Sequence, residues 1–188
     1  METDKINDRI ISDRIILRSI CETDADAIFS YRSLPEIARF QYWEPFTKEQ
    51  TAEFVFQNCN SALSERDKWI GLAITDINSN KLIGDCALKI ENESAEIGCN
   101  ISPDYQNKGI AKEALKMLIF YCFTYTPVTE IIGIADSENE VSIKLMESLG
   151  MIRDDLFVNK MICKGLECTE HKYSLNKENW KQPADYYL

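Results

Sequence analysis

The chain has 188 residues, of which 45% are hydrophobic and 28% charged. This length and composition are typical of one globular domain, which needs no disulfide or metal to bury a core. The formal net charge of -10 has the wrong sign for neutralising nucleic-acid phosphates. We therefore expect a single domain over residues 1–188 and no direct binding of nucleic acid.

The sequence contains no stretch close to the ~20 apolar residues of a membrane span, and Met1 to Arg9 lacks the apolar centre of a signal peptide. These features indicate a cytoplasmic protein without membrane contact. The seven cysteines form no Cys-x-x-Cys pair, which favours reduced thiols. With His171 as the one histidine, the sequence predicts no metal site. Monomer and homodimer both remain open.

The first half of the chain alternates between strand and helix patterns. Thr23-Asp24 offers a helix cap, and Thr47 with Gln50 matches a capping box. Alternating apolar residues then predict three strands in an antiparallel meander. The predicted elements are a strand at 14–18, helices at 25–31 and 47–63, and strands at 70–74, 82–90 and 95–101.

The second half begins with a helical period from Asn107 to Phe123. The isoleucine-rich run Glu130 to Ala135 is typical of a strand that is buried on both faces and parallel to a neighbour. The next helix starts at Glu140 and ends at Gly150, with Val141, Leu145 and Leu149 as its apolar face. Residues 151–175 fit two strands around Lys164-Gly165. Together these elements predict a mixed α/β domain around one sheet.

The segment from Ile101 to Ala111 joins a predicted strand to a predicted helix. Gly109 and Ala111 lack bulk where the chain turns, so backbone N–H groups at the helix start can face a ligand. Such N–H groups and the positive end of the helix dipole bind anions, and Lys108 and Lys112 lie close enough to assist. The segment predicts a phosphate site. Alternatively, Gly109 eases packing and the lysines form a solvated face.

Four ordered motifs together resemble the GNAT superfamily of N-acetyltransferases, over about residues 10 to 180. They are Arg14-Ile15-Ile16-Leu17-Arg18, Gln106-x-x-Gly109-x-Ala111 after Glu96-Ile97-Gly98, the segment 139–151, and Tyr173-Ser174-Leu175 with Glu178-x-Trp180. The second motif resembles the acetyl-CoA diphosphate motif. The first and last resemble the branch that acetylates ribosomal-protein N-termini.

The resemblance implies a GNAT fold of the α/β (α+β) class: one mixed, mostly antiparallel sheet with helices on both faces. The sheet would splay between its fourth and fifth predicted strands, 95–101 and 130–135, and the pantetheine arm of acetyl-CoA would lie there. Asn139 would bond this arm, although an ordinary helix N-cap is the alternative. The implied cofactor-binding residues are Cys99, Asn100, Ile101, Gln106, Asn107, Lys108, Gly109, Ile110, Ala111 and Asn139.

The resemblance also suggests which residue donates a proton to the CoA thiolate that leaves. In much of the superfamily a tyrosine donates this proton, but Met146 holds that position here and cannot donate. Ser142, one turn earlier, matches a serine of the ribosomal-protein branch and can donate or relay through water. The alternative for Ser142 is an ordinary polar residue in the first turn of a helix.

A carboxylate acting through water would suffice as the base. The amine that attacks must be neutral, and an α-amine with a pKa near ~7.7–8.0 is partly so, unlike a lysine near ~10.4. Glu96 is our first candidate and Asp85 the second, while each also fits an ordinary strand residue that faces solvent. No cysteine has a histidine partner predicted nearby, so direct transfer in a ternary complex is preferred.

We therefore expect an acetyl-CoA-dependent N-acetyltransferase acting on a protein or peptide N-terminal α-amine. The aromatic segment 40–46 would line the acceptor pocket, although it could equally cap the core. The negative charge favours a cationic acceptor, but solubility explains it too. The alternatives are a small-molecule amine acetyltransferase, for a polyamine, drug or amino-acid derivative, and a catalytically silent acyl-CoA-binding module.

Overall fold

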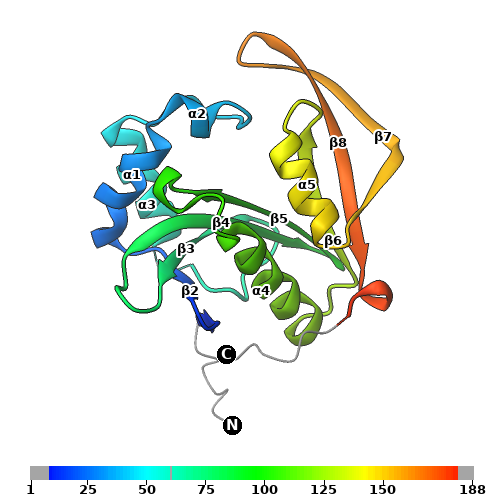
Figure 1. Cartoon of the computed structure of the whole chain (residues 1–188), viewed down its shortest axis with the longest axis horizontal. Coiled ribbons are helices and arrows are strands. Elements are labelled where there is room, and N and C mark those ends of the chain that lie inside the picture. Colours follow the sequence, from blue (N-terminus) through cyan, green and yellow to red (C-terminus); the bar gives the residue numbers. More distant parts are fainter. Residues whose placement is uncertain (1–8, 60, 182–188) are drawn as a thin grey trace.

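The computed structural model describes residues 9–59 and 61–181, which form one sheet with helices on both faces (Figure 1). The strands are β1 (Arg9–Ile11), β2 (Ile15–Ser19), β3 (Trp69–Asp76), β4 (Leu82–Glu91), β5 (Ser94–Ile101), β6 (Glu130–Asp136), β7 (Ile152–Cys163) and β8 (Leu166–Asn176). The helices are α1 (Ala25–Arg32), α2 (Pro35–Ala38), α3 (Lys48–Asn58), α4 (Ile110–Tyr125) and α5 (Glu140–Ser148), with 3-10 turns η1 (Glu22–Asp24), η2 (Pro103–Tyr105) and η3 (Lys177–Asn179).

The strand order in the sheet is β1-β2-β3-β4-β5-β6-β8-β7. From β2 to β5 each strand pairs antiparallel with the next one, and the pairs β3–β4 and β4–β5 confirm the predicted meander of three strands. Strands β5 and β6 pair in parallel, and their pairing covers Ser94 to Glu96 against Glu130 to Ile132 before the strands separate. The sheet is therefore mixed, mostly antiparallel and splayed between the two strands for which this was predicted.

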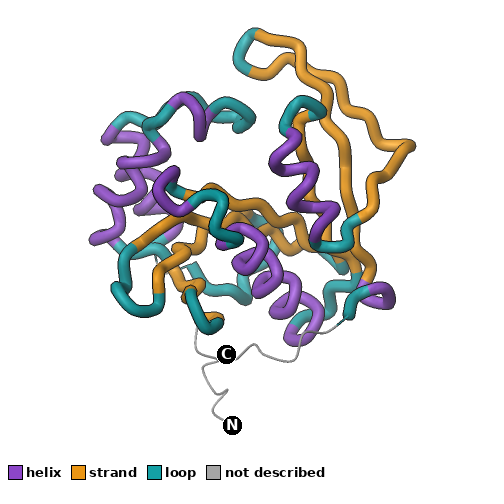
Figure 2. Tube along the Cα trace, viewed as in Figure 1, coloured by secondary structure: helices purple, strands orange, loops and turns teal. Residues whose placement is uncertain are grey.

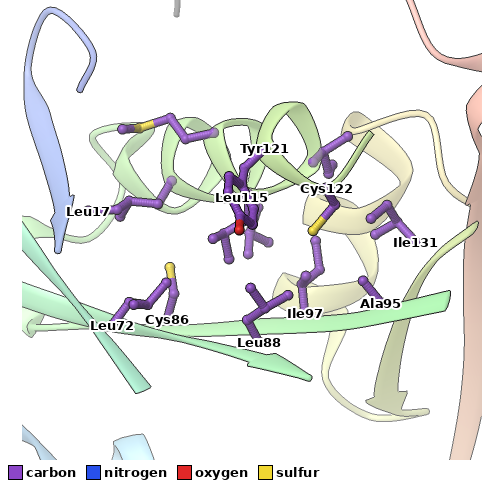
Figure 3. Close-up of a cluster of buried hydrophobic side chains, with 14 of the residues drawn as sticks. Leu17, Leu72, Cys86, Leu88, Ala95, Ile97, Leu115, Tyr121, Cys122 and Ile131 are labelled. Atoms are coloured by element: carbon purple, nitrogen blue, oxygen red, sulfur yellow. The ribbon is translucent and has the colours of Figure 1, made fainter. Parts of the chain in front are cut away.

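The main hydrophobic core lies between α4 and the sheet. Leu115 and Cys122 of α4 point toward Leu88 and Ile97 of the strands beneath (Figure 3), and all four side chains are buried. A second, smaller core joins α1 and α3 to the opposite face. Because helices cover both faces, β3 is buried on both sides along most of its length.

Strand β6 follows its prediction only in part. Its residues Ile131, Gly133 and Ala135 are buried, whereas Ile132 and Ile134 between them are half-buried. Ile134 lines a cavity, so this face of the strand is not fully covered there.

The helix predicted over 47–63 has its capping box but ends early. Thr47 and Gln50 exchange the two expected hydrogen bonds, at 2.8 and 3.2 Å. Cys59 then takes an extended conformation and bridges to Ile20, so the apolar residues up to Leu63 do not continue the helix. The predicted boundary was wrong because a contact with a distant strand competes with helical periodicity.

Two of the other three helix predictions also need correction, one at its start and one in its apolar face. Helix α4 begins at Ile110 rather than Asn107, because Gly109 has a left-handed backbone with φ +77°. In α5, Val141 is 78% exposed, while Met146 is buried. Strand β1 and the one-turn helix α2 were missed, since such short segments depend on tertiary pairing.

The long β7–β8 hairpin rises beyond α5, opposite α2 (Figure 2). Its turn at Lys164-Gly165 has positive φ at both residues, which confirms the predicted turn. None of the helices within 9–59 and 61–181 is long and apolar enough to cross a membrane. The prediction of one domain over residues 1–188 includes residues 1–8, 60 and 182–188, outside the described part, and stays a prediction.

Candidate active site

A cavity of about 470 Å³ lies where β5 and β6 separate. Its walls come from both strands, from the first turn of α5, from β8 and from segment 40–46. This volume falls in the ordinary range for a small-molecule site. The predicted site residues that it brings together are Glu96, Cys99, Asn100, Asn139 and Ser142.

The aromatic segment 40–46, predicted to line an acceptor pocket, forms one wall of this cavity. Phe40, Tyr42, Trp43 and Phe46 all line it. The guanidinium of Arg32 lies 4.8 Å from the Trp43 ring and 5.1 Å from the Phe46 ring, so cation–π contacts hold the segment against α1.

The β7–β8 hairpin reaches across the cavity to segment 40–46 and to the residues just before it. Lys164 Nζ donates to the backbone oxygens of Ala38 and Arg39 at 2.6 and 3.1 Å. Nearer the cavity, the Tyr42 hydroxyl donates to the Glu170 carboxylate. These contacts bring elements from the two ends of the chain together around one space.

Asp85 is wrong as a candidate base. Its side chain is buried and accepts from Arg32 Nη2 at 2.6 Å and from Asn100 Nδ2 at 3.1 Å, and the Tyr31 hydroxyl donates to it as well. A carboxylate that accepts from three side chains, one of them a buried guanidinium, has its oxygens committed to the structure. We call Tyr31, Arg32, Asp85 and Asn100 the Arg32 cluster.

Glu96 has the opposite environment. It lines the cavity and is half-buried, and burial raises the pKa of its carboxyl above the ordinary value. Lys89 opposes this shift, while the negative charge of Glu170 adds to it. A carboxylate held near a cavity with a raised pKa is suited to accept a proton.

Glu170 was missed in the sequence because it lies in a strand pattern far along the chain from Glu96. It is 8% exposed and lines the same cavity. Besides the Tyr42 hydroxyl, it accepts from Asn159 Nδ2 at 3.0 Å. These partners are neutral, so the Glu96–Glu170 pair lacks the buried cation that Asp85 has.

The two thiols at the cavity are not suited to nucleophilic chemistry. Burial raises the pKa of Cys99 to about 12, and Cys86 is shifted well above its ordinary pKa for the same reason. Both therefore stay protonated near neutral pH. Within the described residues, no group of three His, Cys, Asp or Glu is placed to hold a metal ion.

Asn139 and Ser142 stand together at the start of α5. Asn139 Oδ1 accepts from the Ser142 N–H at 3.2 Å, so the N-cap interpretation of Asn139 holds for this oxygen. The amide nitrogen is the group that Asn139 can still offer to a ligand. Met146 instead packs against β6, where a Cβ on Gly133 would lie 2.5 Å from its Sδ.

The other predicted cofactor residues, Ile101 and Gln106 to Ala111, lie outside the lining of this cavity. They form the turn into α4, in which Gln106 Nε2 donates to Ile101 O at 2.9 Å. Gly109 precedes the helix without a side-chain cap, and Ile110 buries its side chain in the core. Their backbone N–H groups are thus the groups that can meet an anion.

These residues fit acetyl-CoA. Beyond Glu96, the edge of β5 toward β6 is unpaired, which suits a ligand with amide groups. The uncapped start of α4 suits the diphosphate. The cavity with Glu96 and Ser142 then lies where a reactive thioester and an amine can meet.

The chain matches known acetyltransferases. Residues 14–152 match the family model described as "Acetyltransferase (GNAT) domain". The chain is 30% identical over 174 residues to "Uncharacterized N-acetyltransferase p20" of Bacillus licheniformis, which covers 91% of this chain and 97% of that protein.

Two solved structures share its fold. One is a ribosomal-protein-S5-alanine acetyltransferase from Vibrio fischeri, with TM-score 0.74, 21% identity and coverage of 93% of this chain and 99% of that one. The other is a spermidine N-acetyltransferase from Vibrio cholerae in complex with CoA and spermine, with TM-score 0.73, 20% identity and coverage of 88% and 96%.

Proposed function

The chain belongs to the GNAT acetyltransferase family and is an acetyl-CoA-dependent N-acetyltransferase, and we propose that its acceptor is the N-terminal α-amine of a protein or peptide. The ribosomal-protein acetyltransferase among the structural neighbours supports this acceptor class. The observation that carries the proposal is the set of bases that line the cavity.

Among the described residues that line the cavity, the side chains that can serve as a base are carboxylates. The wall carries Glu96, Asp136 and Glu170, whereas the Tyr42 phenol and the two thiols have raised pKa values and stay protonated. A carboxylate is too weak a base to deprotonate efficiently a lysine side chain, whose pKa is ~10.4. An α-amine has a pKa of ~7.7–8.0 and is therefore partly neutral before it binds, so it suits this site.

Each site residue has a role in this reaction. Glu96 accepts the proton of the amine, directly or through water. The Asn139 amide nitrogen orients the pantetheine arm, and the Ser142 hydroxyl donates or relays a proton to the departing sulfur. Bound acetyl-CoA supplies the acetyl thioester, and the protonated thiols of Cys86 and Cys99 favour direct transfer over an acetyl-cysteine.

A polyamine is the second candidate acceptor. It is favoured by the Glu96–Glu170 pair, because two carboxylates without a buried cation attract a substrate with more than one positive charge. The spermidine N-acetyltransferase among the structural neighbours agrees with this class. Its amines arrive almost fully protonated, which is why we rank it second.

The test compares three acceptors at equal concentration and pH: a peptide with a free N-terminus and one internal lysine, the same peptide with a blocked N-terminus, and spermidine. We expect thiol release from acetyl-CoA chiefly with the first peptide, and mass spectrometry should place the acetyl group on its α-amine. Acetylation mainly on lysine Nε would contradict the proposal. Faster turnover of spermidine would favour the second candidate.

The cofactor site is tested separately by calorimetric titration. Gly109→Glu should weaken acetyl-CoA binding strongly, because it places bulk and negative charge at the start of α4. Gly165→Glu is the matched control, since Gly165 has a similar backbone, with φ +78°, but lies in the β7–β8 turn. Equal affinity of the two folded variants would remove the assignment of the diphosphate to this turn. Binding of acetyl-CoA without thiol release for any acceptor would indicate a silent binding module.

A further inference from the structure

The turn that leads into α4 is held by a side chain from the other end of the chain. Arg14, between β1 and β2, donates from Nη1 to the backbone oxygen of Lys108 at 3.0 Å. Its Nε donates to Glu113 Oε2 at 2.7 Å, and its Nη2 donates to the same oxygen. Ser12 Oγ completes the group by donating to Glu113 Oε1 at 2.7 Å. The bridge joins the β1–β2 turn to both the loop and the first turn of α4.

This bridge fixes the direction of one peptide group. In a trans peptide the C=O and the following N–H point in opposite directions, and the described residues contain no cis peptide bond. Because Arg14 holds the Lys108 carbonyl, the N–H of Gly109 must point away from Arg14. The bond also keeps the negative end of this peptide dipole away from the space that the N–H faces.

The charges around Arg14 indicate that it orients the turn into α4 rather than attracts an anion. Arg14 is paired with Glu113, whose side chain is 14% exposed, so its positive charge is largely compensated at short range. A pair that is close to neutral adds little attraction for an anion. Its contribution is orientation: the Lys108 carbonyl is held toward Arg14, and the Gly109 N–H points away from Arg14.

We propose that Arg14 is a positioning residue for acetyl-CoA, which orients the Gly109 N–H toward the diphosphate through the Lys108 carbonyl. The inference rests on the proposed function, which places the diphosphate at this turn. Glu113 assists by fixing the guanidinium, because it binds two of its nitrogens.

The test uses Arg14→Ala, Glu113→Ala and, as a control that removes the same charge, Arg9→Ala on the exposed start of β1. Calorimetry measures the affinity of each folded variant for CoA. Steady-state kinetics then compare acetyl-CoA with S-acetylpantetheine, which carries the same thioester without the diphosphate.

We expect Arg14→Ala to weaken CoA binding by roughly tenfold to a hundredfold, the range for one hydrogen bond to a charged group. Its kcat/KM with S-acetylpantetheine should stay within about twofold of the parent protein, and Arg9→Ala should change neither quantity. Glu113→Ala should also weaken CoA binding, although removing a negative charge would strengthen simple attraction.

Three results would overturn the inference: unchanged CoA affinity in Arg14→Ala, equal losses with both acetyl donors, or tighter CoA binding in Glu113→Ala. If Arg14→Ala does not fold, Glu113→Ala alone decides between orientation and attraction. A different result would overturn the proposed function instead, namely a parent protein that binds CoA no better than pantetheine.

Discussion

Asp85, behind one wall of the cavity, and Glu96, on its lining, lie in opposite environments. In the Arg32 cluster, Asp85 is buried against a guanidinium and two further donors. In the Glu96–Glu170 pair, Glu96 meets a second carboxylate across the space, and burial raises the pKa of its carboxyl. The cluster contributes to stability because its carboxylate is paired with a buried guanidinium, whereas neither carboxylate of the pair is bound to a buried cation, which leaves the pair suited to chemistry.

The difference also shows how the site is assembled. Arg32 is held between Asp85 and aromatic rings, at 4.1 Å from that of Phe54, so the cluster fixes the wall formed by segment 40–46. Glu96 and Glu170 lie on strands that pairing with their neighbours holds rigid. The wall fixed by the Arg32 cluster thus faces the Glu96–Glu170 pair, which lacks a buried cation. The following variants separate the structural role of the cluster from the chemical role of the pair.

The largest expected effect is on stability, at the Arg32 cluster. Asp85→Asn leaves the buried charge of Arg32 without its counterion, which should lower the free energy of unfolding by about 3–5 kcal/mol. Chemical denaturation measures this loss. Asp26→Asn, on an exposed position of α1, is the control and should change it by no more than about 0.5 kcal/mol. A loss below about 1 kcal/mol for Asp85→Asn would show that the cluster is not compensated as described.

The next effect is on catalysis, at the Glu96–Glu170 pair. Glu96→Gln should lower kcat/KM by roughly 10²–10³-fold, because the amide cannot accept the proton of the amine. Acetyl-CoA affinity, followed by calorimetry, should remain unchanged. Full activity in this variant would mean that water alone serves as the base.

Replacement of Ser142 by alanine should have a smaller effect on the same reaction. General acid catalysis contributes about 10²–10⁴-fold, and the lower end applies because a CoA thiolate leaves readily and water can substitute. The loss should appear in kcat at saturating acceptor, with little change in acetyl-CoA affinity. A variant that keeps full kcat, with chemistry rate-limiting, would reduce Ser142 to a structural residue.

The smallest effect concerns pH. Burial raises the pKa of Glu96 and the charge of Glu170 adds to this shift, so Glu170→Gln should lower the pKa, while its one amide oxygen still accepts from either Tyr42 or Asn159. Because Glu96 must be ionised to act as a base, the acidic limb of the kcat/KM profile should move to lower pH, by less than about one unit. Glu96→Gln should lack this limb. An unmoved limb in Glu170→Gln would show that the two carboxylates do not interact.

The sequence by itself determined most of the fold and the position of the turn into α4. Alternating and helical periods, together with Gly109 and Gly150, are local signals, so they located the meander, α4 and the turn into that helix. The capping box at Thr47 was equally local. The short β1 and the early end of α3 lacked such signals, because contacts with distant residues decide them.

Only the tertiary structure decided which carboxylates are available. Asp85 and Glu96 look alike in the sequence, since both lie in alternating strands next to apolar residues. Arg32 reaches Asp85 from a helix, whereas Glu170 comes beside Glu96 through the last strand of the chain. The availability of a carboxylate depends on the charges and burial around it, and those come from segments that no local pattern connects.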